Sequence, residues 1–544
     1  SSLYFWFIAQ YYCIIDYEVS QKYRLNSLVS SVKLPRFIYF SLITGLFMKI
    51  TSHRLFYPLL LALIIFGVYS YTFDAKVAQL GDNASYFMLG KALSAGEGYV
   101  NISKITKTPN NHYPPGFPAF LGLGMMLGLG ITGLKILNGL ALIIAAGILY
   151  ILSEKLTGSR VLAFCATLLT ILNYHILQYG SMLMSETLFM CLSLLALWFA
   201  ANTQKIKDHN FILAVAFGIF AYYTRSLGLA LIVAITVYYF SQKKWREATI
   251  YFAAFVAAAL PWFVRSQRLG GGSYTRQLQM INPYRPELGN ANLTDYFTRI
   301  WENFSRYISK EIPYSLFPGD MPNYQEPATL GSWLLGIFLV AAVIYGALRL
   351  EKYRLLILGY LFFTFGILML WPDVWVGPRF MLPLIPVMYL GLLQGLTSLF
   401  TLLLSQANKS FQPGWLAALA IFLIPSVNVL HDQAKTPLHP AWQNYYAVAT
   451  WLSRNEKPDV VVSCGKPALF HLYSGTFTSR YAFDNNPETL ISELEKAQVD
   501  YVVLDQVYPN TIRYLLPAIQ TYPERFQQVH SLKNPETYLF KFVK

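Results

Sequence analysis

Charged residues are scarce in this chain. Asp, Glu, Lys and Arg together make up 13% of its 544 residues, whereas 55% are hydrophobic. Soluble proteins usually carry about 25% charged residues, and the mean hydropathy here is +0.39. So little polar surface cannot cover a water-soluble globule of this length. We therefore expect most of the chain to face lipid, which excludes an ordinary soluble protein.

Cysteine and metal-binding patterns are also sparse. The four cysteines predict neither a disulfide framework nor a zinc site, because two lie in apolar runs and a single one lies in the polar C-terminal part. The predicted outer loops contain no Asp, Glu and His cluster with metal-ligand spacing. We expect no metal and no cofactor.

The first 47 residues lack an apolar run long enough to cross a membrane. Residue 1 is Ser, and Met48 precedes a basic stretch and the first long apolar run, so we interpret residues 1–47 as an extension without a role in the fold. An interfacial amphipathic arm is the alternative.

Long apolar runs fill the chain between residues 48 and 432. A membrane-crossing helix needs about 20 mainly apolar residues, and the pattern predicts about eleven spans. The second is unusually long and contains a possible break at Gly128-Leu129-Gly130. The predicted spans are 57–74, 117–150, 161–179, 186–201, 211–223, 227–240, 248–264, 331–348, 355–371, 381–404 and 415–431.

The formal net charge of +14 could indicate a nucleic-acid partner. The basic residues, however, form short clusters between apolar runs, which is typical of cytoplasmic loops. This predicts a cytoplasmic N-terminus and no nucleic-acid partner. The clusters are Lys49/Arg54, Lys155/Arg160, Lys205/Lys207, Lys243/Lys244/Arg246, Arg349/Lys352/Arg354 and Lys409.

The remaining links then lie on the outer face. They include the loops 75–116 and 265–330 and everything after about residue 432. Most isolated charges that border spans also fall on this face. They are Asp82, Glu186, Arg225, Arg265, Asp373 and Arg379.

Residues 433–544 differ from the rest in composition. Short β-branched or aromatic runs at 460–464, 501–505 and 538–543 predict strands, and PETLISELEKAQ predicts a helix between the first two. We expect a small extracytoplasmic α/β domain with a partly parallel sheet. No glycine-rich phosphate loop follows either of the first two strands, so no nucleotide site is expected there.

Two carboxylates on the outer face are candidates for chemistry. Asp82 follows the first span, opens a predicted helix and has Tyr86 at helical spacing; it could also be a simple N-cap. The nearby HYPPGFPAF, 112–120, is stiffened by prolines. It adds His112 and Tyr113 to Tyr86 as candidate substrate contacts. Glu186 begins a span, where a helix N-terminus also favours an acid.

Three arginines share this face. Arg225 interrupts an apolar stretch, which is costly unless the charge is paired or solvated. Arg265 and Arg379 could each be simple headgroup anchors. Together, guanidinium groups suit phosphate oxygens, so a lipid phosphate is the expected ligand. A carboxylate base opposite a leaving phosphate predicts sugar transfer with inversion.

The chain resembles the GT-C membrane glycosyltransferases over about residues 55–432. The resemblance lies in six stretches that follow one another in the same order: GDNASY, HYPPGFP, MSETLF, TRSLGL, PWFVRSQ and GPRFMLPLIP. The similarity is greatest to the bacterial branch related to protein O-mannosyltransferases and lipid A aminoarabinose transferases. It implies Asp82 as catalytic base and Arg265 as a polyprenyl-phosphate contact, with Arg225 and Arg379 in support. Many relatives have an acidic pair at this position. Here Asn83 follows Asp82, which leaves Glu186 as the nearest candidate for a second carboxylate.

The resemblance implies an enzyme of a bacterial inner membrane. Its donor would be a polyprenyl-monophosphate sugar and its acceptor a lipid, glycan or protein on the outer face. A secondary transporter, a lipid-linked glycan polymerase or ligase with a diphosphate donor, and a non-catalytic scaffold are the alternatives. A transporter would place its site near the membrane midplane in repeated halves, and no such repeat is visible.

Overall fold

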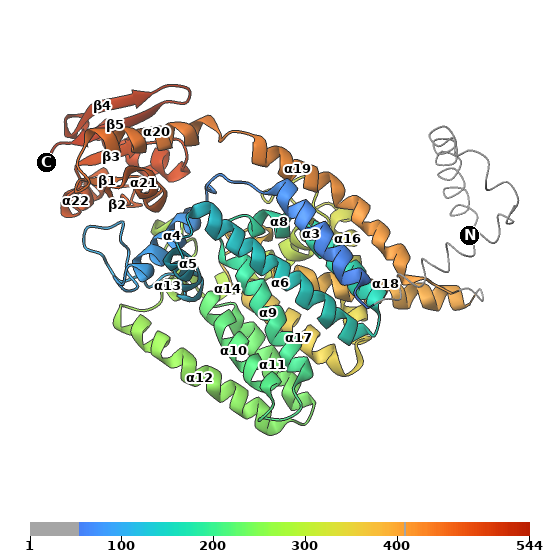
Figure 1. Cartoon of the computed structure of the whole chain (residues 1–544). Coiled ribbons are helices and arrows are strands. Elements are labelled where there is room, and N and C mark those ends of the chain that lie inside the picture. The colour runs from blue at the N-terminus through green and yellow to red at the C-terminus, as the bar shows by residue number, and fades with distance from the viewer. Residues whose placement is uncertain (1–53, 407–409) are drawn as a thin grey trace, which may run out of the picture. The chain divides into compact units, whose positions relative to one another are not determined.

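The computed structural model describes residues 54–406 and 410–544. The predicted extension 1–47, Met48, Lys49 and Lys409 lie outside the described residues. Pro58–Lys544 forms one compact unit, to which the following description applies. The described chain is mainly helical, with one sheet near the C-terminus (Figure 1).

Seven described helices are long and apolar enough to cross a membrane, and a pair bent by 62° would make an eighth. The protein is thus a multi-pass membrane protein, while the count of about eleven spans stays a prediction. The long helices are α6 (Ile131–Thr157), α9 (Ser185–Asn202), α12 (Trp245–Arg268), α16 (Leu330–Leu348), Glu351–Met369 with α17 (Arg354–Met369), α18 (Ile385–Ser405) and Pro413–Asn455. The bent pair is α7 (Arg160–Leu172) with α8 (Tyr174–Gly180), and shorter apolar helices are α3 (Phe56–Thr72), α5 (Gly116–Met126), α10 (His209–Thr224) and α11 (Gly228–Ser241).

The predicted span 117–150 is broken where the glycines suggested. Helix α5 ends at Met126 and α6 begins at Ile131. Between them Gly128 has φ +81°, a left-handed conformation that side chains with a Cβ rarely adopt. The chain therefore forms two helices here instead of continuing as one.

Glycines allow α16 and α18 to pack backbone against backbone. A Cβ at Gly346 would lie 1.9 Å from the carbonyl oxygen of Gly391, and one at Gly395 would lie 2.2 Å from that of Ala342. Small residues at such crossings are the usual way in which membrane helices approach closely. This packing fixes the start of α18, just after the loop that carries Arg379.

The C-terminal domain contains a five-stranded sheet in the order β2-β1-β3-β5-β4 (Figure 1). Strands β1, β2 and β3 are parallel, whereas β5 runs antiparallel to β3 and β4. The structure thus contains the predicted partly parallel sheet. Its elements are α19 (Ile424–Lys435), leading in, then α20 (Pro440–Asn455), β1 (Val461–Ser463), α21 (Pro467–Ser474), β2 (Phe477–Ser479), α22 (Pro487–Lys496), β3 (Tyr501–Leu504), α23 (Leu516–Thr521), β4 (Phe526–Leu532) and β5 (Thr537–Phe542).

Two strands were not predicted. Strand β2 has three residues, too few to show a pattern, and β4 is an edge strand whose sequence FQQVHSL is mostly polar and exposed. Their pairing partners, and not their own composition, make them strands.

Helix α4 (Gly81–Ser94) connects the apolar helices with the C-terminal domain. It packs against α5 on one side, and its Ala84 belongs to the hydrophobic cluster of the C-terminal domain that includes Tyr445 and Phe470. Because Asp82 lies in the first turn of this helix, the packing brings the C-terminal domain next to that carboxylate.

Candidate active site

A cavity of about 570 Å³ lies where α4, the loop after it and the C-terminal domain meet. Its walls come from segments far apart in the sequence. They include Asp82, Tyr86, His112, Tyr113, Arg225, Gln277, Tyr284, Trp371, Trp375, Arg379, Lys466, Arg480 and Tyr508.

Asp82 is held by two partners at the cavity wall. Tyr113 Oη donates a hydrogen bond to Oδ1 at 2.8 Å, and Arg379 Nη2 lies 3.1 Å from Oδ2. The N-cap of α4 is Leu80, so Asp82 does not serve as that cap. Burial alone would raise the pKa of this carboxyl group, but Arg379 and the bond from Tyr113 outweigh it, and the pKa is lowered. Asp82 is therefore an anion at neutral pH.

Glu186 is the second carboxylate and is fully buried in the first turn of α9. Its Oε1 lies 2.7 Å from Arg225 Nη1 and 3.0 Å from Arg379 Nε. Arg379 thus bridges Asp82 and Glu186 through two different nitrogens. These two acids and two arginines form a charge-balanced network, which makes burial of Glu186 tolerable.

Hydroxyl groups extend this network. Ser185 Oγ accepts a hydrogen bond from Arg225 at 3.0 Å and lies 3.2 Å from Tyr86 Oη. The rings of Tyr86 and Tyr113 pack with centroids 4.7 Å apart. His112 stands beside them at the cavity wall; its burial, countered by Asp82 and assisted by Arg480, lowers the pKa of the imidazole. The structure therefore brings seven of the eight predicted site residues together.

Arg265 is the eighth, and it does not line the cavity. Its guanidinium donates to the carbonyl oxygens of Asn110 at 2.9 Å and Tyr99 at 3.5 Å. It also lies over the ring of Trp262, 4.9 Å from the centroid. In this arrangement Arg265 fixes the loop that leads to His112.

Several cavity residues escaped sequence reasoning. Lys466, Arg480 and Tyr508 come from the C-terminal domain, and Tyr284 comes from the long loop 265–330. None of them belongs to a recognisable motif, so no local signal singles it out. Trp371 and Trp375 flank the recognised Asp373 but were not assigned a role.

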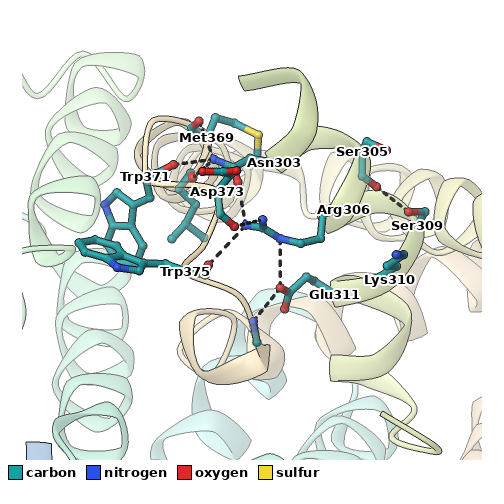
Figure 2. A network of polar contacts seen from close by, with 12 residues as sticks. Asn303, Ser305, Arg306, Ser309, Lys310, Glu311, Met369, Trp371, Asp373 and Trp375 are labelled. Atoms are coloured by element: carbon teal, nitrogen blue, oxygen red, sulfur yellow. Dashed lines mark hydrogen bonds and ion pairs between the residues drawn. The ribbon is translucent and has the colours of Figure 1, made fainter. Parts of the chain in front are cut away.

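A second polar network holds the loop that carries Arg379 (Figure 2). It is provided by α14 (Leu293–Arg306) and the turn of π-helix after it. Arg306 Nη1 donates to the carbonyl oxygen of Asp373 at 2.5 Å (Figure 2). Glu311 Oε1 accepts a hydrogen bond from the backbone N–H of Gly377 at 2.9 Å. Gly377 has φ +113°, which only glycine adopts readily. The loop is therefore tied down two residues before Arg379.

Asn303 ties down the start of the same loop. Its Nδ2 donates to the carbonyl oxygens of Leu368, Met369 and Trp371, at 3.3, 2.9 and 2.8 Å. The last carbonyls of a helix have no partner within it, so this buried side chain caps the C-terminal end of α17 from outside.

Asn303→Ala should lower both stability and turnover. The part-buried carbonyls of Met369 and Trp371 lose this donor, which costs at most about 1–3 kcal/mol, and the loop carrying Arg379 loses its anchor. Thermal unfolding of the detergent-purified protein and its turnover measure the two effects. Ser305→Ala, on the same helix, is the matched control. An Asn303→Ala variant that unfolds and reacts like the control would show that the anchor is dispensable.

Among the described residues, no group of three or more His, Cys, Asp or Glu side chains could hold a metal ion. The expectation that the reaction needs neither metal nor cofactor stays a prediction.

Known proteins show the same architecture. Residues 112–264 match the model of the dolichyl-phosphate-mannose-protein mannosyltransferase family. The structure is similar to ArnT from Cupriavidus metallidurans bound to undecaprenyl phosphate, with a TM-score of 0.56 and 13% identity over 90% of this chain and 99% of that chain. This chain has the GT-C fold.

Two further structures support this fold. ArnT in the apo state gives a TM-score of 0.54 at 13% identity, covering 89% of this chain and 97% of that chain. The apo oligosaccharyltransferase from Archaeoglobus fulgidus gives 0.53 at 11% identity, covering 83% and 69%. No curated protein sequence matches the chain significantly. The chain thus has the GT-C fold that its sequence landmarks predicted.

Proposed function

We propose that this protein transfers a sugar from a polyprenyl-monophosphate donor to a lipid, glycan or protein acceptor, with inversion at the anomeric carbon. The observation that carries the proposal is the contact between Asp82 and Arg379 at the wall of a cavity lined by cations. A proton acceptor and phosphate-binding groups thus share one cavity. The family model matched by residues 112–264 and the undecaprenyl phosphate in the ArnT complex agree with such a donor.

Asp82 is the proposed base. It would take the proton from an acceptor hydroxyl or amine that attacks the anomeric carbon from the face opposite the phosphate. Arg379 and Arg225 favour phosphate binding electrostatically, and Arg379 helps to keep Asp82 ionised. Tyr86, His112 and Tyr113 would contact the substrate. The reaction would take place on the extracytoplasmic side, with the C-terminal domain on that side as well.

The position of the cavity favours an enzyme over a transporter. Its walls come from helix ends, loops and the C-terminal domain. A secondary transporter would place its polar residues near the membrane midplane, on broken helices in repeated halves.

The decisive experiment incubates the purified protein in lipid with a panel of polyprenyl-phosphate sugars and measures free polyprenyl phosphate. We expect release of polyprenyl phosphate from at least one hexosyl or pentosyl donor, and the donor that reacts identifies the sugar. Release from diphosphate donors alone would instead indicate a polymerase or ligase. Movement of a sugar across vesicles without release would indicate a transporter.

Arg265→Ala should raise the KM for the donor more than the KM for the acceptor. Because Arg265 does not line the cavity, the effect would arise through the 110–113 loop, which Arg265 supports at Asn110 and which forms the wall around Asp82. Steady-state kinetics with each substrate varied in turn measure the two constants. The exposed Arg268, one turn further along α12, provides the control Arg268→Ala. Equal changes for both substrates would argue against a role in donor binding.

A further inference from the structure

Two cations from the C-terminal domain face the cavity. Lys466 lies just before α21 and Arg480 directly follows β2. Among the described residues, neither forms an ion pair with a carboxylate, in contrast to Arg225 and Arg379. They are therefore the cavity cations that remain available to a ligand.

Aromatic rings hold the two cations in place. The Lys466 ammonium lies 4.5 Å from the ring centroid of Tyr508, and the Arg480 guanidinium lies 6.0 Å from the same centroid. Arg480 also lies 5.6 Å from the centroid of Phe483. Tyr508 is thus shared by both cations, which orients them toward the same space without neutralising them.

The charge balance at this end of the cavity is positive. Asp505 is a further carboxylate behind the wall; its Oδ1 accepts hydrogen bonds from the backbone of Val507 and Tyr508, at 2.9 and 3.2 Å. Around the whole cavity, three carboxylates stand against four cations. The carboxylates are Asp82, Glu186 and Asp505, and the cations are Arg225, Arg379, Lys466 and Arg480. Burial and the nearby charge of Arg480 lower the pKa of Lys466, as expected for cations held together. An anionic ligand would relieve this repulsion.

We propose that Lys466 and Arg480 form a phosphate-binding site for a substrate of the sugar transfer. This inference rests on the proposed function and adds the residues that receive the phosphate. Arg225 and Arg379 are already committed to Glu186 and Asp82. The phosphate belongs either to the lipid donor or to the acceptor.

The chemistry explains why a donor phosphate needs such a site. The donor is a phosphodiester with one negative charge. When its anomeric C–O bond breaks, the electron pair stays on the phosphate oxygen, the acceptor oxygen or nitrogen bonds to the carbon, and its proton goes to Asp82. The leaving polyprenyl phosphate then has two negative charges, and cations that face the developing charge stabilise the transition state more than the ground state.

Binding of farnesyl phosphate to the full-length protein in lipid nanodiscs tests the site without any sugar. The variant Lys466→Gln/Arg480→Gln should bind farnesyl phosphate at least ten-fold more weakly than wild type. Farnesol, which lacks the phosphate, should bind both proteins equally. The double variant Lys496→Gln/Arg454→Gln is the control, because it removes the same charge from exposed positions of the same domain.

Binding of inorganic phosphate to the same variants distinguishes a donor phosphate from an acceptor phosphate. Weaker binding of farnesyl phosphate assigns the site to the donor, whereas weaker binding of inorganic phosphate alone assigns it to a phosphate of the acceptor. Unchanged binding of both probes would overturn the inference. In that case release of polyprenyl phosphate by wild type would leave the proposed function intact; failure of wild type to release it from any donor would refute the function itself.

Discussion

Asp82→Asn is expected to lower sugar transfer by about 10²–10⁴-fold, the usual contribution of a positioned general base. The amide can still accept the hydrogen bond from Tyr113, so the protein should fold and insert normally. It cannot take the proton from the acceptor. Turnover with the donor identified by the panel measures the loss.

The control for this variant is Asp74→Asn. Asp74 lies in the preceding loop and forms a partly exposed pair with Lys76, so its loss removes the same charge nearby. Transfer by Asp82→Asn at the control's rate would remove Asp82 from its proposed role.

The pH dependence of sugar transfer should report the ionisation of Asp82. The pKa of Asp82 is lowered in the folded protein, so its ionised form persists at neutral pH and is lost as the pH falls through that lowered value. The pH dependence of kcat/KM reports ionisation in the free enzyme. The midpoint of its acid limb should therefore lie below the ordinary Asp pKa of about 3.9. A phosphate on Lys466 and Arg480 would raise the pKa of Asp82 by repulsion. The acid limb of kcat should therefore lie at higher pH than that of kcat/KM.

Arg379→Gln is expected to impair both stability and activity. Among the residues that the structure describes, it leaves the fully buried Glu186 with Arg225 as its remaining cation and leaves Asp82 without an ion pair. Removing one partner of a buried ion pair costs about 3–5 kcal/mol. Thermal unfolding in detergent should show a clear decrease in Tm, and turnover should fall at least 100-fold.

A compensating change separates the two effects. Arg379→Gln combined with Glu186→Gln restores charge balance, so stability should recover in part while turnover stays low. Arg379→Lys keeps the charge, but a single ammonium cannot reproduce the two-nitrogen bridge between the carboxylates, so it should be intermediate. An Arg379→Gln variant with the Tm of wild type would show that the bridge adds nothing to stability.

Much of the site was predictable because its charges stand out against apolar surroundings. Asp82, Glu186, Arg225 and Arg379 are costly near a membrane unless they are paired, and the structure pairs all four. Arg265 was found by the same logic, yet it contacts backbone carbonyls of the 99–110 loop. A lone arginine at a helix end has the same sequence pattern whether it faces a ligand or a neighbouring loop.

Composition and apolar periodicity alone determined that this is a multi-pass membrane protein with a small α/β domain at its C-terminus, because lipid restricts spanning segments to helices and closed barrels. The order of landmarks determined the GT-C fold. Tertiary structure alone decided that Lys466, Arg480 and Tyr508 face Asp82, and that Asn303, Arg306 and Glu311 anchor the loop of Arg379. These residues meet through packing between segments hundreds of positions apart or across different helices, and such contacts leave no pattern in the neighbouring sequence.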